Sequence, residues 1–314
     1  MKQIIVKVND IMEKIKTVSI ENDFLKATFR ICGAELASLV SKQSQLDYIF
    51  PAIPQFWSKS SPVLFPVVGC VKDNKLIHND KEYTMYLHGF ANYQDFEVVF
   101  RDDAKIEFLL SSNGNFKDSY PFEFNLFLGY ELISNKLVVS WRVENLSNET
   151  MYFSIGGHPA FTCPIDESKR ENYFLKFEGL TKLKRSKIDM SCGLLYDEMF
   201  ELDLNLKDKD GNCGVIGISD DLFNEDALIG EGNQTHEISL LRPNKTPYIK
   251  VSFKAPLFGV WSPGDKIAPF VCIEPWYGRC DKKSFNGELK DREWENTLLP
   301  NDIFNASYEI TVCE

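Results

Sequence analysis

Apolar and polar residues alternate along most of the chain, which is the pattern of β-strands that bury one face. The alternation is regular in the segments 25–31, 136–143, 173–177 and 249–253. Between residues 96 and 110 it is interrupted by two acidic residues, and we expect a hairpin there. Turn-forming residues recur and no long helical pattern separates the strands, so the sequence predicts an all-β sandwich or barrel.

Helical patterns are few and short. Residues 9–16 and 220–228 are each predicted to form a short helix. We assign residues 1–16 to an N-terminal extension and residues 17–314 to a single domain, because neither a repeat nor a Pro/Ser-rich linker divides the chain. A length of 314 residues is compatible with one large all-β domain.

The composition is that of a folded, β-rich protein. Hydrophobic residues make up 44% and charged residues 26%, which excludes a disordered or collagen-like chain. Aromatic residues reach 13%, which favours β-sheet and suits a surface that binds the flat faces of sugar rings. The net charge of −11 repels phosphate backbones and anionic lipids, so neither nucleic acids nor membranes are expected partners.

We expect a cytoplasmic protein with reduced cysteines. The chain start lacks the apolar region of a secretion signal, and its stretches without charge are shorter than the ~20 residues of a membrane-spanning helix. None of the eight cysteines is spaced as C-x-x-C. The four histidines are not at metal-ligand spacing, so no zinc site is predicted, and His78 and His236 are expected to be solvated.

Three segments break the alternation: 86–90, 153–161 and 270–278. Functional polar groups of β proteins are often found where a strand gives way to a loop. Each segment carries one titratable residue of interest, namely His88, His158 and Glu274. These three residues are therefore the candidates for chemistry.

The two histidines differ in their settings. His158 follows two glycines, which allow unusual φ values, and precedes Pro159, so a constrained backbone presents the imidazole. It is either functional or a core histidine bonded to a carbonyl. His88 is followed by Gly89 and is either functional or a structural histidine at a strand end.

Glu274 closes the apolar run 270–273, and period two places it on the same side as Cys272. We expect Pro275 to end the strand. A carboxylate here is either paired with Arg279 in a structural ion pair or used as a general base, whose pKa burial would raise.

Two further residues remain open. Asp226 is either a helix or turn carboxylate or a ligand of the substrate, and Trp261 either stacks on a ligand or fills the core. No dinucleotide, P-loop or nucleophile-elbow motif is present, so no cofactor is expected. Two histidines and one carboxylate suit proton transfer.

Six segments resemble, in the same order, the aldose 1-epimerase (galactose mutarotase) family in its LacX-like branch. They are residues 33–39, 62–69, 88–91, 154–161, 226–229 and 272–276. The similarity extends over roughly residues 17 to 312. It implies a galactose mutarotase-like β-sandwich (a supersandwich) with few short helices and a concave site for a monosaccharide.

The resemblance also implies roles for individual residues. His158 corresponds to the general acid of the family, Glu274 to its general base and His88 to its second histidine. Asp226 corresponds to a carboxylate that contacts sugar hydroxyls, and Trp276 and Trp261 are expected to bind substrate. We expect a monomer or a homodimer.

Cys70 departs from the family pattern. Many relatives carry an arginine at this position, and a thiol cannot clamp a hydroxyl or phosphate as a guanidinium does. Lys72 and Lys75 follow closely and could supply point charges instead. We nevertheless expect a neutral hydroxyl at the 6-position of the sugar, because the protein is acidic overall.

The predicted function is interconversion of the α- and β-anomers of a free aldohexose such as galactose or glucose. Ring opening requires a base for the anomeric hydroxyl and an acid for the ring oxygen, expected on opposite sides of the C1–O5 bond. The alternatives are a non-catalytic carbohydrate-binding or sensing protein on the same fold, or a sugar-6-phosphate mutarotase. A glycosidase is disfavoured because the motifs offer Glu274 no second carboxylate.

Overall fold

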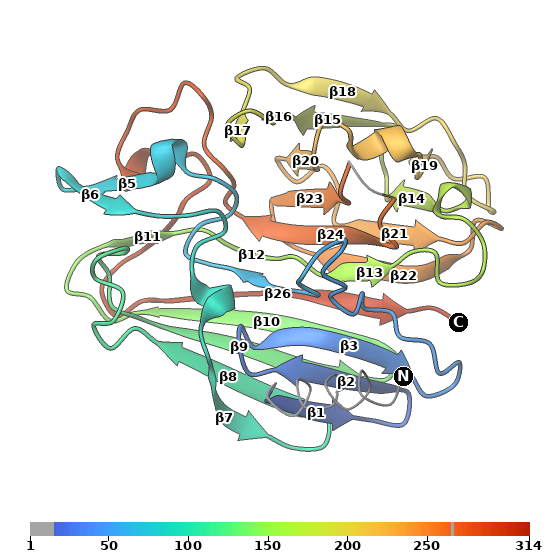
Figure 1. Cartoon of the computed structure of the whole chain (residues 1–314), viewed down its shortest axis with the longest axis horizontal. Helices are drawn as coiled ribbons and strands as arrows, with labels where there is room; N and C mark the ends of the chain where they lie inside the picture. The colour runs from blue at the N-terminus through green and yellow to red at the C-terminus, as the bar shows by residue number, and fades with distance from the viewer. Residues whose placement is uncertain (1–15, 265–266) are drawn as a thin grey trace.

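Two large antiparallel β-sheets dominate the computed structural model, which describes residues 16–264 and 267–314 (Figure 1). The helices of this part of the chain are 3-10 turns of three or four residues. They are η1 (Lys72–Asn74), η2 (Ala91–Tyr93), η3 (Arg170–Asn172), η4 (Asp220–Phe223) and η5 (Leu289–Asp291). None of them is long and apolar enough to cross a membrane. The all-β prediction is confirmed.

The larger sheet has nine strands. In spatial order they are β19 (Val215–Gly217), β14 (Phe174–Phe177), β21 (Glu237–Leu241), β22 (Pro247–Phe253), β26 (Ile303–Val312), β10 (Lys136–Asn145), β9 (Phe124–Ile133), β8 (Lys105–Ser111) and β7 (Glu97–Arg101).

The second sheet has eight strands. In spatial order they are β18 (Phe200–Asp203), β15 (Lys182–Ser186), β20 (Leu228–Glu231), β23 (Leu257–Trp261), β24 (Phe270–Tyr277), β12 (Ile155–Gly157) and β4 (Val63–Leu64), while β13 (Ala160–Thr162) pairs with β24 beside this path.

The remaining strands form small sheets. A three-stranded sheet contains β1 (Thr17–Glu21), β2 (Leu25–Arg30) and β3 (Glu35–Ser41). Three strand pairs are β5 (Lys75–His78) with β6 (Lys81–Thr84), β11 (Met151–Phe153) with β25 (Asn296–Leu298), and β16 (Ile188–Asp189) with β17 (Leu194–Leu195).

The two large sheets bury a shared core, and the alternation in the sequence shows which face of each strand points inward. In β10, Leu137, Val139 and Trp141 are buried while Ser140 between them is exposed. Val271 and Ile273 of β24 belong to the same hydrophobic cluster as these β10 residues. The result is a sandwich in which each large sheet contributes one inner face.

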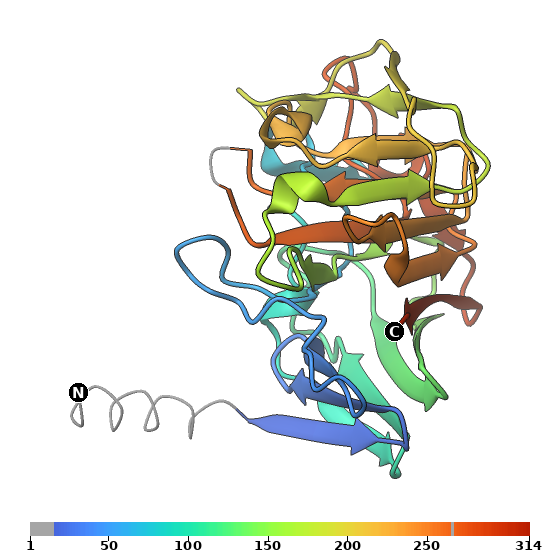
Figure 2. The ribbon, with the colours of Figure 1, turned by 90° about the vertical axis from the view of Figure 1, so that its right-hand side faces the viewer.

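The three-stranded sheet closes one end of this sandwich. Phe29 of β2 packs its ring 5.8 Å from Phe108 of β8 and 4.4 Å from Tyr130 of β9. The Tyr130 hydroxyl donates a hydrogen bond of 2.8 Å to the carbonyl of Ala34. Figure 2 shows this blue sheet at the opposite end of the molecule from the yellow strands β15 and β18 of Figure 1.

The predicted hairpin between residues 96 and 110 is formed by β7 and β8, but β7 buries neither face. Val98, Val99 and Phe100 are all exposed because β7 is the edge strand of the nine-stranded sheet. The register of the pair shifts between Val98 and Phe100. Alternation in the sequence therefore overstated the burial of this strand.

The two predicted helices, 9–16 and 220–228, have different outcomes. In the segment 220–228 only η4 forms, and β20 already begins at Leu228. The helix predicted for 9–16 lies almost wholly outside the described residues, as does the extension 1–16. The division into this extension and a domain of residues 17–314 stays a prediction.

The prediction for His78 was wrong, whereas His236 is exposed as expected. His78 lies at the end of β5 and is buried. Its Nε2 lies 2.9 Å from Oε2 of Glu149, and its ring packs 4.8 Å from that of Phe122. A polar sequence context did not reveal this burial, because the covering side chains come from residues distant in the sequence.

Candidate active site

A cavity of about 600 Å³ lies on the face of the eight-stranded sheet that points away from the shared core. Its floor comes from strands β4, β20, β23 and β24, and its walls from the connecting segments around residues 57–70 and 86–93. The six residues predicted to form the site all line it: His88, His158, Asp226, Trp261, Glu274 and Trp276.

Strand β24 supplies the carboxylate, and its side chains alternate as predicted. Val271 and Ile273 point into the shared core, whereas Cys272 and Trp276 belong to clusters on the cavity face. Glu274 lies between Cys272 and Trp276 on that face. The strand thus places one carboxylate between two apolar clusters.

Pro275 does not end the strand, contrary to expectation, because β24 continues to Tyr277. The N–H of Ile273 donates to the carbonyl of Pro159. Two residues later the nitrogen of Pro275 faces the same side. The pairing of β24 with β13 ends at Cys272 and its pairing with β12 starts at Trp276, so Pro275 lies between the two ladders and its missing N–H costs no ladder hydrogen bond.

His158 lies in this break between β12 and β13, and its N–H donates to the carbonyl of Pro62 at 3.1 Å. The two preceding glycines do not have positive φ values, so the predicted reason for them was wrong. A Cβ on Gly156 would lie 2.5 Å from Cδ1 of Trp276, and one on Gly157 would lie 2.8 Å from the hydroxyl of Tyr308. The glycines permit close packing beneath the imidazole.

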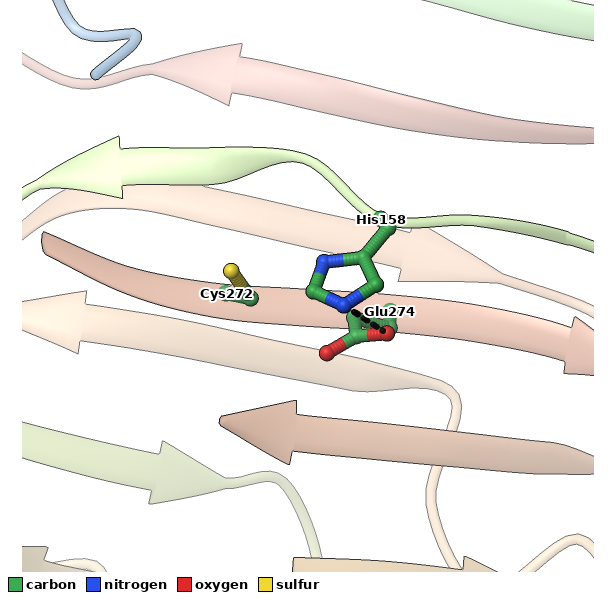
Figure 3. A group of neighbouring side chains, drawn as sticks. All are labelled: His158, Cys272 and Glu274. Atoms are coloured by element: carbon green, nitrogen blue, oxygen red, sulfur yellow. Dashed lines mark ion pairs between the residues drawn. The ribbon is translucent and has the colours of Figure 1, made fainter. Parts of the chain in front are cut away.

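His158 and Glu274 meet on one wall of the cavity (Figure 3). Nε2 of His158 lies 3.3 Å from Oε2 of Glu274, and the side chains are only 8% and 1% exposed. The alternative in which Glu274 pairs with Arg279 is wrong, since Arg279 pairs with Glu231 at 3.1 Å and with Glu293. The pair is adjacent rather than placed on opposite sides of a sugar.

Burial opposes charge on both members of this pair. It raises the pKa of Glu274 well above the usual range, and the nearby charge of Asp226 raises it further. Burial also lowers the pKa of His158 well below its usual value, with His88 adding to the effect. The pair therefore holds one proton near neutral pH, in a state with no net charge.

His88 lies in a turn between β6 and η2, not at a strand end, and has a φ of 63°. Its Nδ1 accepts the N–H of Gly69 at 3.1 Å, so neutral His88 carries its proton on Nε2. Its ring lies 5.6 Å from that of His158. Burial lowers the pKa of His88 to about 4, which keeps it a neutral hydrogen-bond donor.

Asp226 lines the cavity from a turn with a φ of 65°, and its Oδ1 accepts the N–H of Ala227 at 2.7 Å. Burial raises its pKa. The cavity thus contains a second carboxylate besides Glu274, so the sequence argument that Glu274 has no carboxylate partner does not hold. Cys70 also lines the cavity, and burial and the charge of Asp226 raise the pKa of its thiol.

Aromatic rings surround His158. The rings of Trp57 and Trp261 lie 4.8 Å and 5.6 Å from its imidazole. Trp261 contacts both Trp57 and the apolar Phe270, so it belongs to the cavity wall and to a packed cluster at once. Such rings suit the apolar faces of a sugar.

The cavity residues missed by the sequence reasoning include Trp57, Lys59, Asn92 and Tyr93. Nζ of Lys59 donates to the carbonyl of Asn92 at 3.0 Å and lies 4.4 Å from the centre of the Tyr93 ring. These residues lie in loops and a 3-10 turn without periodicity. For Trp57, Lys59 and Tyr93, the sequence offered only the residue type, aromatic or cationic, as an indication of a binding role.

The lysines expected near Cys70 do not reach the cavity. Lys72 donates to the carbonyl of Phe285 at 2.7 Å, and Lys75 pairs with Glu82 at 2.7 Å. Within the described part of the chain, Lys59 is the cationic side chain that lines the cavity.

Comparison with known proteins agrees with this architecture. Residues 16–310 match the aldose 1-epimerase family. Protein LacX (plasmid) of Lactococcus lactis subsp. lactis is 27% identical over 307 residues, which cover 94% of this chain and 99% of LacX.

Two solved structures are also similar. One is a galactose mutarotase related enzyme from Lactobacillus acidophilus, with a TM-score of 0.88 and 32% identity over 95% of this chain and 98% of that one. The other is a galactose mutarotase-like protein from Lactobacillus casei, with a TM-score of 0.87 and 25% identity over 95% of this chain and 100% of that one. The fold is a galactose mutarotase-like β-sandwich, and the chain belongs to the aldose 1-epimerase family.

Proposed function

We propose that the protein is an aldose 1-epimerase that interconverts the α- and β-anomers of a free aldohexose such as galactose or glucose. The observation that carries the proposal is the buried His158–Glu274 pair, 3.3 Å apart on the wall of a cavity with aromatic sides. A pair that holds one proton supplies one acid and one base. Anomer interconversion requires both and consumes neither.

Ring opening moves two protons around one carbon atom. In the resting pair the shared proton lies on Glu274, so it first passes to Nε2 of His158 across their 3.3 Å contact. Glu274 then takes the proton of the anomeric hydroxyl while His158 gives a proton to the ring oxygen, and the C1–O5 bond breaks to leave an open-chain aldehyde. Both oxygens are bonded to C1, so adjacent groups on one wall can serve both. Rotation about C1–C2 exposes the other face of the aldehyde, and ring closure returns both protons.

His88 and Asp226 hold the sugar in this scheme. Neutral His88 donates from Nε2 to a sugar oxygen, because its Nδ1 is occupied by the N–H of Gly69. Asp226 accepts from sugar hydroxyls, while Trp261 and Trp276 pack against the apolar faces of the ring. No group in this scheme requires a cofactor.

We further propose that the 6-position of the sugar is a neutral hydroxyl. A dianionic phosphate usually requires arginine forks. Here Asp226 and Glu274 line the cavity with Lys59, whose ammonium already donates to a backbone carbonyl. The test compares kcat/KM for glucose and glucose 6-phosphate at one ionic strength. A preference for the phosphorylated sugar that disappears in Lys59→Ala would overturn this assignment.

The proposal includes a setting for the enzyme. We place its activity in the cytoplasm, on monosaccharides, and expect a monomer or homodimer that requires neither nucleic acid nor membrane. The acidic net charge of −11 supports this choice of partner.

Polarimetry tests the function directly. The optical rotation of freshly dissolved α-D-galactose or α-D-glucose is followed with and without the protein. We expect relaxation to equilibrium much faster than in the buffer alone.

Two other outcomes would point elsewhere. A rate equal to that of the buffer, with sugar binding intact, would identify a carbohydrate-binding protein. Hydrolysis of nitrophenyl glycosides would instead favour a glycosidase that uses Glu274 and Asp226.

A further inference from the structure

Cys272 lies beside the His158–Glu274 pair, although it is far from His158 in the sequence (Figure 3). One ligand atom from each of the three side chains lies within 4.8 Å of the other two. All three residues are buried. We propose that His158, Cys272 and Glu274 form a Zn²⁺-binding site that overlaps the acid–base pair and, when occupied, stops its chemistry.

The types of donor atom favour zinc. An imidazole nitrogen, a thiolate sulfur and a carboxylate oxygen are the three ligands that proteins use for Zn²⁺, whereas Mg²⁺ and Ca²⁺ prefer oxygen alone. Three protein ligands leave the fourth tetrahedral position open. Because His158 and Glu274 line the cavity, water can enter and occupy that position.

The three ligand atoms are nearly as close together as a tetrahedral zinc site requires. Zinc bonds of about 2.0–2.3 Å place neighbouring ligand atoms roughly 3.5 Å apart. Nε2 of His158 and Oε2 of Glu274 are already 3.3 Å apart. The thiol of Cys272 completes the site if the widest separation closes by roughly 1 Å, which a small side-chain rotation supplies.

Oε2 of Glu274 is free to bind a metal. It is buried and makes no well-aligned hydrogen bond within the described residues, and its polar neighbour is Nε2 of His158 at 3.3 Å, itself a ligand of the proposed site. Cys272 packs among apolar neighbours such as Phe50 and Ala160, and its thiol makes no hydrogen bond to the described residues. Binding a cation would satisfy a carboxylate oxygen that the fold leaves without a donor.

Charge balances when the site fills. Before binding, the thiol is neutral and the His158–Glu274 pair holds one proton, so the total charge is zero. Binding of Zn²⁺ displaces the thiol proton and the proton of the pair, and leaves a thiolate and a carboxylate against the +2 ion. The buried site is neutral in both states, and about two protons are released for each ion.

We expect reversible rather than permanent binding. Tight zinc sites usually orient each histidine through a hydrogen bond from its other ring nitrogen, and loss of that bond weakens binding by about 10–100-fold. Nδ1 of His158 has no hydrogen-bond partner among the described residues. The site is therefore suited to respond to changes in free zinc.

The inhibitory consequence rests on the proposed function. A zinc ion bound to Nε2 of His158 and to the carboxylate of Glu274 occupies the lone pairs that would accept protons. The base and the acid are lost together. Metal binding itself does not depend on that function and is measured separately.

The binding experiment uses Co²⁺ as a spectroscopic substitute for zinc, added to the metal-free full-length protein. Cobalt bound to a thiolate shows a charge-transfer absorption in the near ultraviolet. We expect one Co²⁺ per chain with this band. Cys272→Ala should abolish the band, and Cys272→Ser serves as a second variant of nearly unchanged volume.

Cys70→Ala is the matched control, because Cys70 is a thiol that lines the cavity but does not belong to the cluster of His158, Cys272 and Glu274. The band should persist in this variant and disappear on addition of Zn²⁺. Absence of the band from the wild-type protein, or its persistence in both variants of Cys272, would overturn the proposal.

The inhibition experiment measures anomer interconversion at increasing free Zn²⁺. We expect inhibition that EDTA reverses, and Cys272→Ala should keep the basal rate while requiring at least ~10-fold more zinc. Equal inhibition of both proteins would refute the assignment of Cys272. If the protein has no mutarotase activity, the cobalt spectrum still decides whether the site exists.

Discussion

Two histidine–glutamate pairs in the described part of the chain differ chiefly in the exposure of the carboxylate. Nε2 of His78 lies 2.9 Å from Glu149, and Nε2 of His158 lies 3.3 Å from Glu274. Both histidine side chains are 8% exposed. The carboxylate of the first pair is 47% exposed, whereas that of the second is 1% exposed.

We expect solvent access to the carboxylate to separate the structural pair His78–Glu149 from the proposed catalytic pair His158–Glu274. Water stabilises the charge on Glu149, and Asn79 donates further hydrogen bonds to the pair. Glu274 has no such support, so burial raises its pKa and leaves a proton to be shared with His158. His158 and Glu274 line the cavity of about 600 Å³, whereas neither His78 nor Glu149 does.

The largest expected effect separates the two pairs by activity. Glu274→Gln and His158→Gln should each lower kcat by about 10²–10⁴-fold, because each removes one proton-transfer group. Glu149→Gln is the matched control and should stay within about twofold of the wild type, since its pair does not touch the cavity. Polarimetric kcat values for the three variants give the answer. Near-normal turnover by Glu274→Gln would remove the base assignment.

The pH profile of kcat sharpens the same contrast. Ordinary pKa values would assign the acidic limb to Glu274 and the basic limb to His158. Here the pKa of Glu274 is raised and that of His158 is lowered, so the assignments exchange. Activity should fall at high pH, when the pair loses its proton, and at low pH, when it gains a second one. Rates from about pH 4 to pH 10 should form a broad bell.

Glu149→Gln is the control for this profile and should superimpose on the wild type. A rate that keeps rising with pH across the whole range would show that the pair does not act through one shared proton.

The next prediction concerns the close packing of Gly156 beneath the His158–Glu274 pair. Gly156→Ala brings a Cβ within 2.5 Å of the Trp276 ring and should destabilise the protein by about 2–3 kcal/mol through overpacking. The control is Gly217→Ala in β19, where the nearest atom of another side chain lies 4.0 Å away. Urea unfolding of both variants provides the measurement. Equal stability of the two would show that this sheet yields to the extra methyl group.

In contrast to His78 and His158, His88 accepts a hydrogen bond from a backbone N–H and does not pair with a carboxylate. Its pKa is about 4 in the folded protein against 6.5 in a free chain. The folded state therefore gains stability above pH 6.5 and loses it as the pH falls towards 4, by up to about 3 kcal/mol. His88→Gln should flatten this part of the curve.

The measurement compares urea midpoints of the wild type and His88→Gln at several pH values within that window. The glutamine oxygen can still accept the N–H of Gly69, so the change in slope isolates the titration. Parallel curves for the two proteins would contradict a depressed pKa.

The smallest effect is expected at the exposed pair. Glu149→Gln should change the free energy of unfolding by less than about 1 kcal/mol, because a half-exposed ion pair contributes little. The effect should shrink further at high salt. A loss above about 2 kcal/mol would mean that Glu149 is as important to the fold as a buried partner, and would weaken the distinction drawn between the two pairs.

Much of the fold was predictable because the buried face of a strand shows in the alternation of apolar and polar residues along it. The alternation in β2, β10, β14 and β22 matched their buried faces. It failed in β7, since an edge position depends on which strands lie beside it, and sequence alternation does not report this.

The site was predictable in part for a different reason. His88, His158 and Glu274 stood out because their segments interrupt the strand pattern, and the structure brings them together around one cavity. Trp57 and Lys59 lie in a loop, where no periodicity indicates direction. The approach of Cys272 to His158 depends on the break between β12 and β13, which no spacing of ligands along the chain reveals.

The side chains of strand β24 alternate between the two faces of the sheet. Val271 and Ile273 enter the shared core, whereas Cys272, Glu274 and Trp276 lie on the opposite face, where Glu274 and Trp276 line the cavity. Insertion or deletion of one residue within this strand would exchange the two sets, turning Glu274 towards the hydrophobic core and an isoleucine towards the cavity. Point substitutions can be tested one at a time here, but changes of length are tolerated only in pairs or outside the strand.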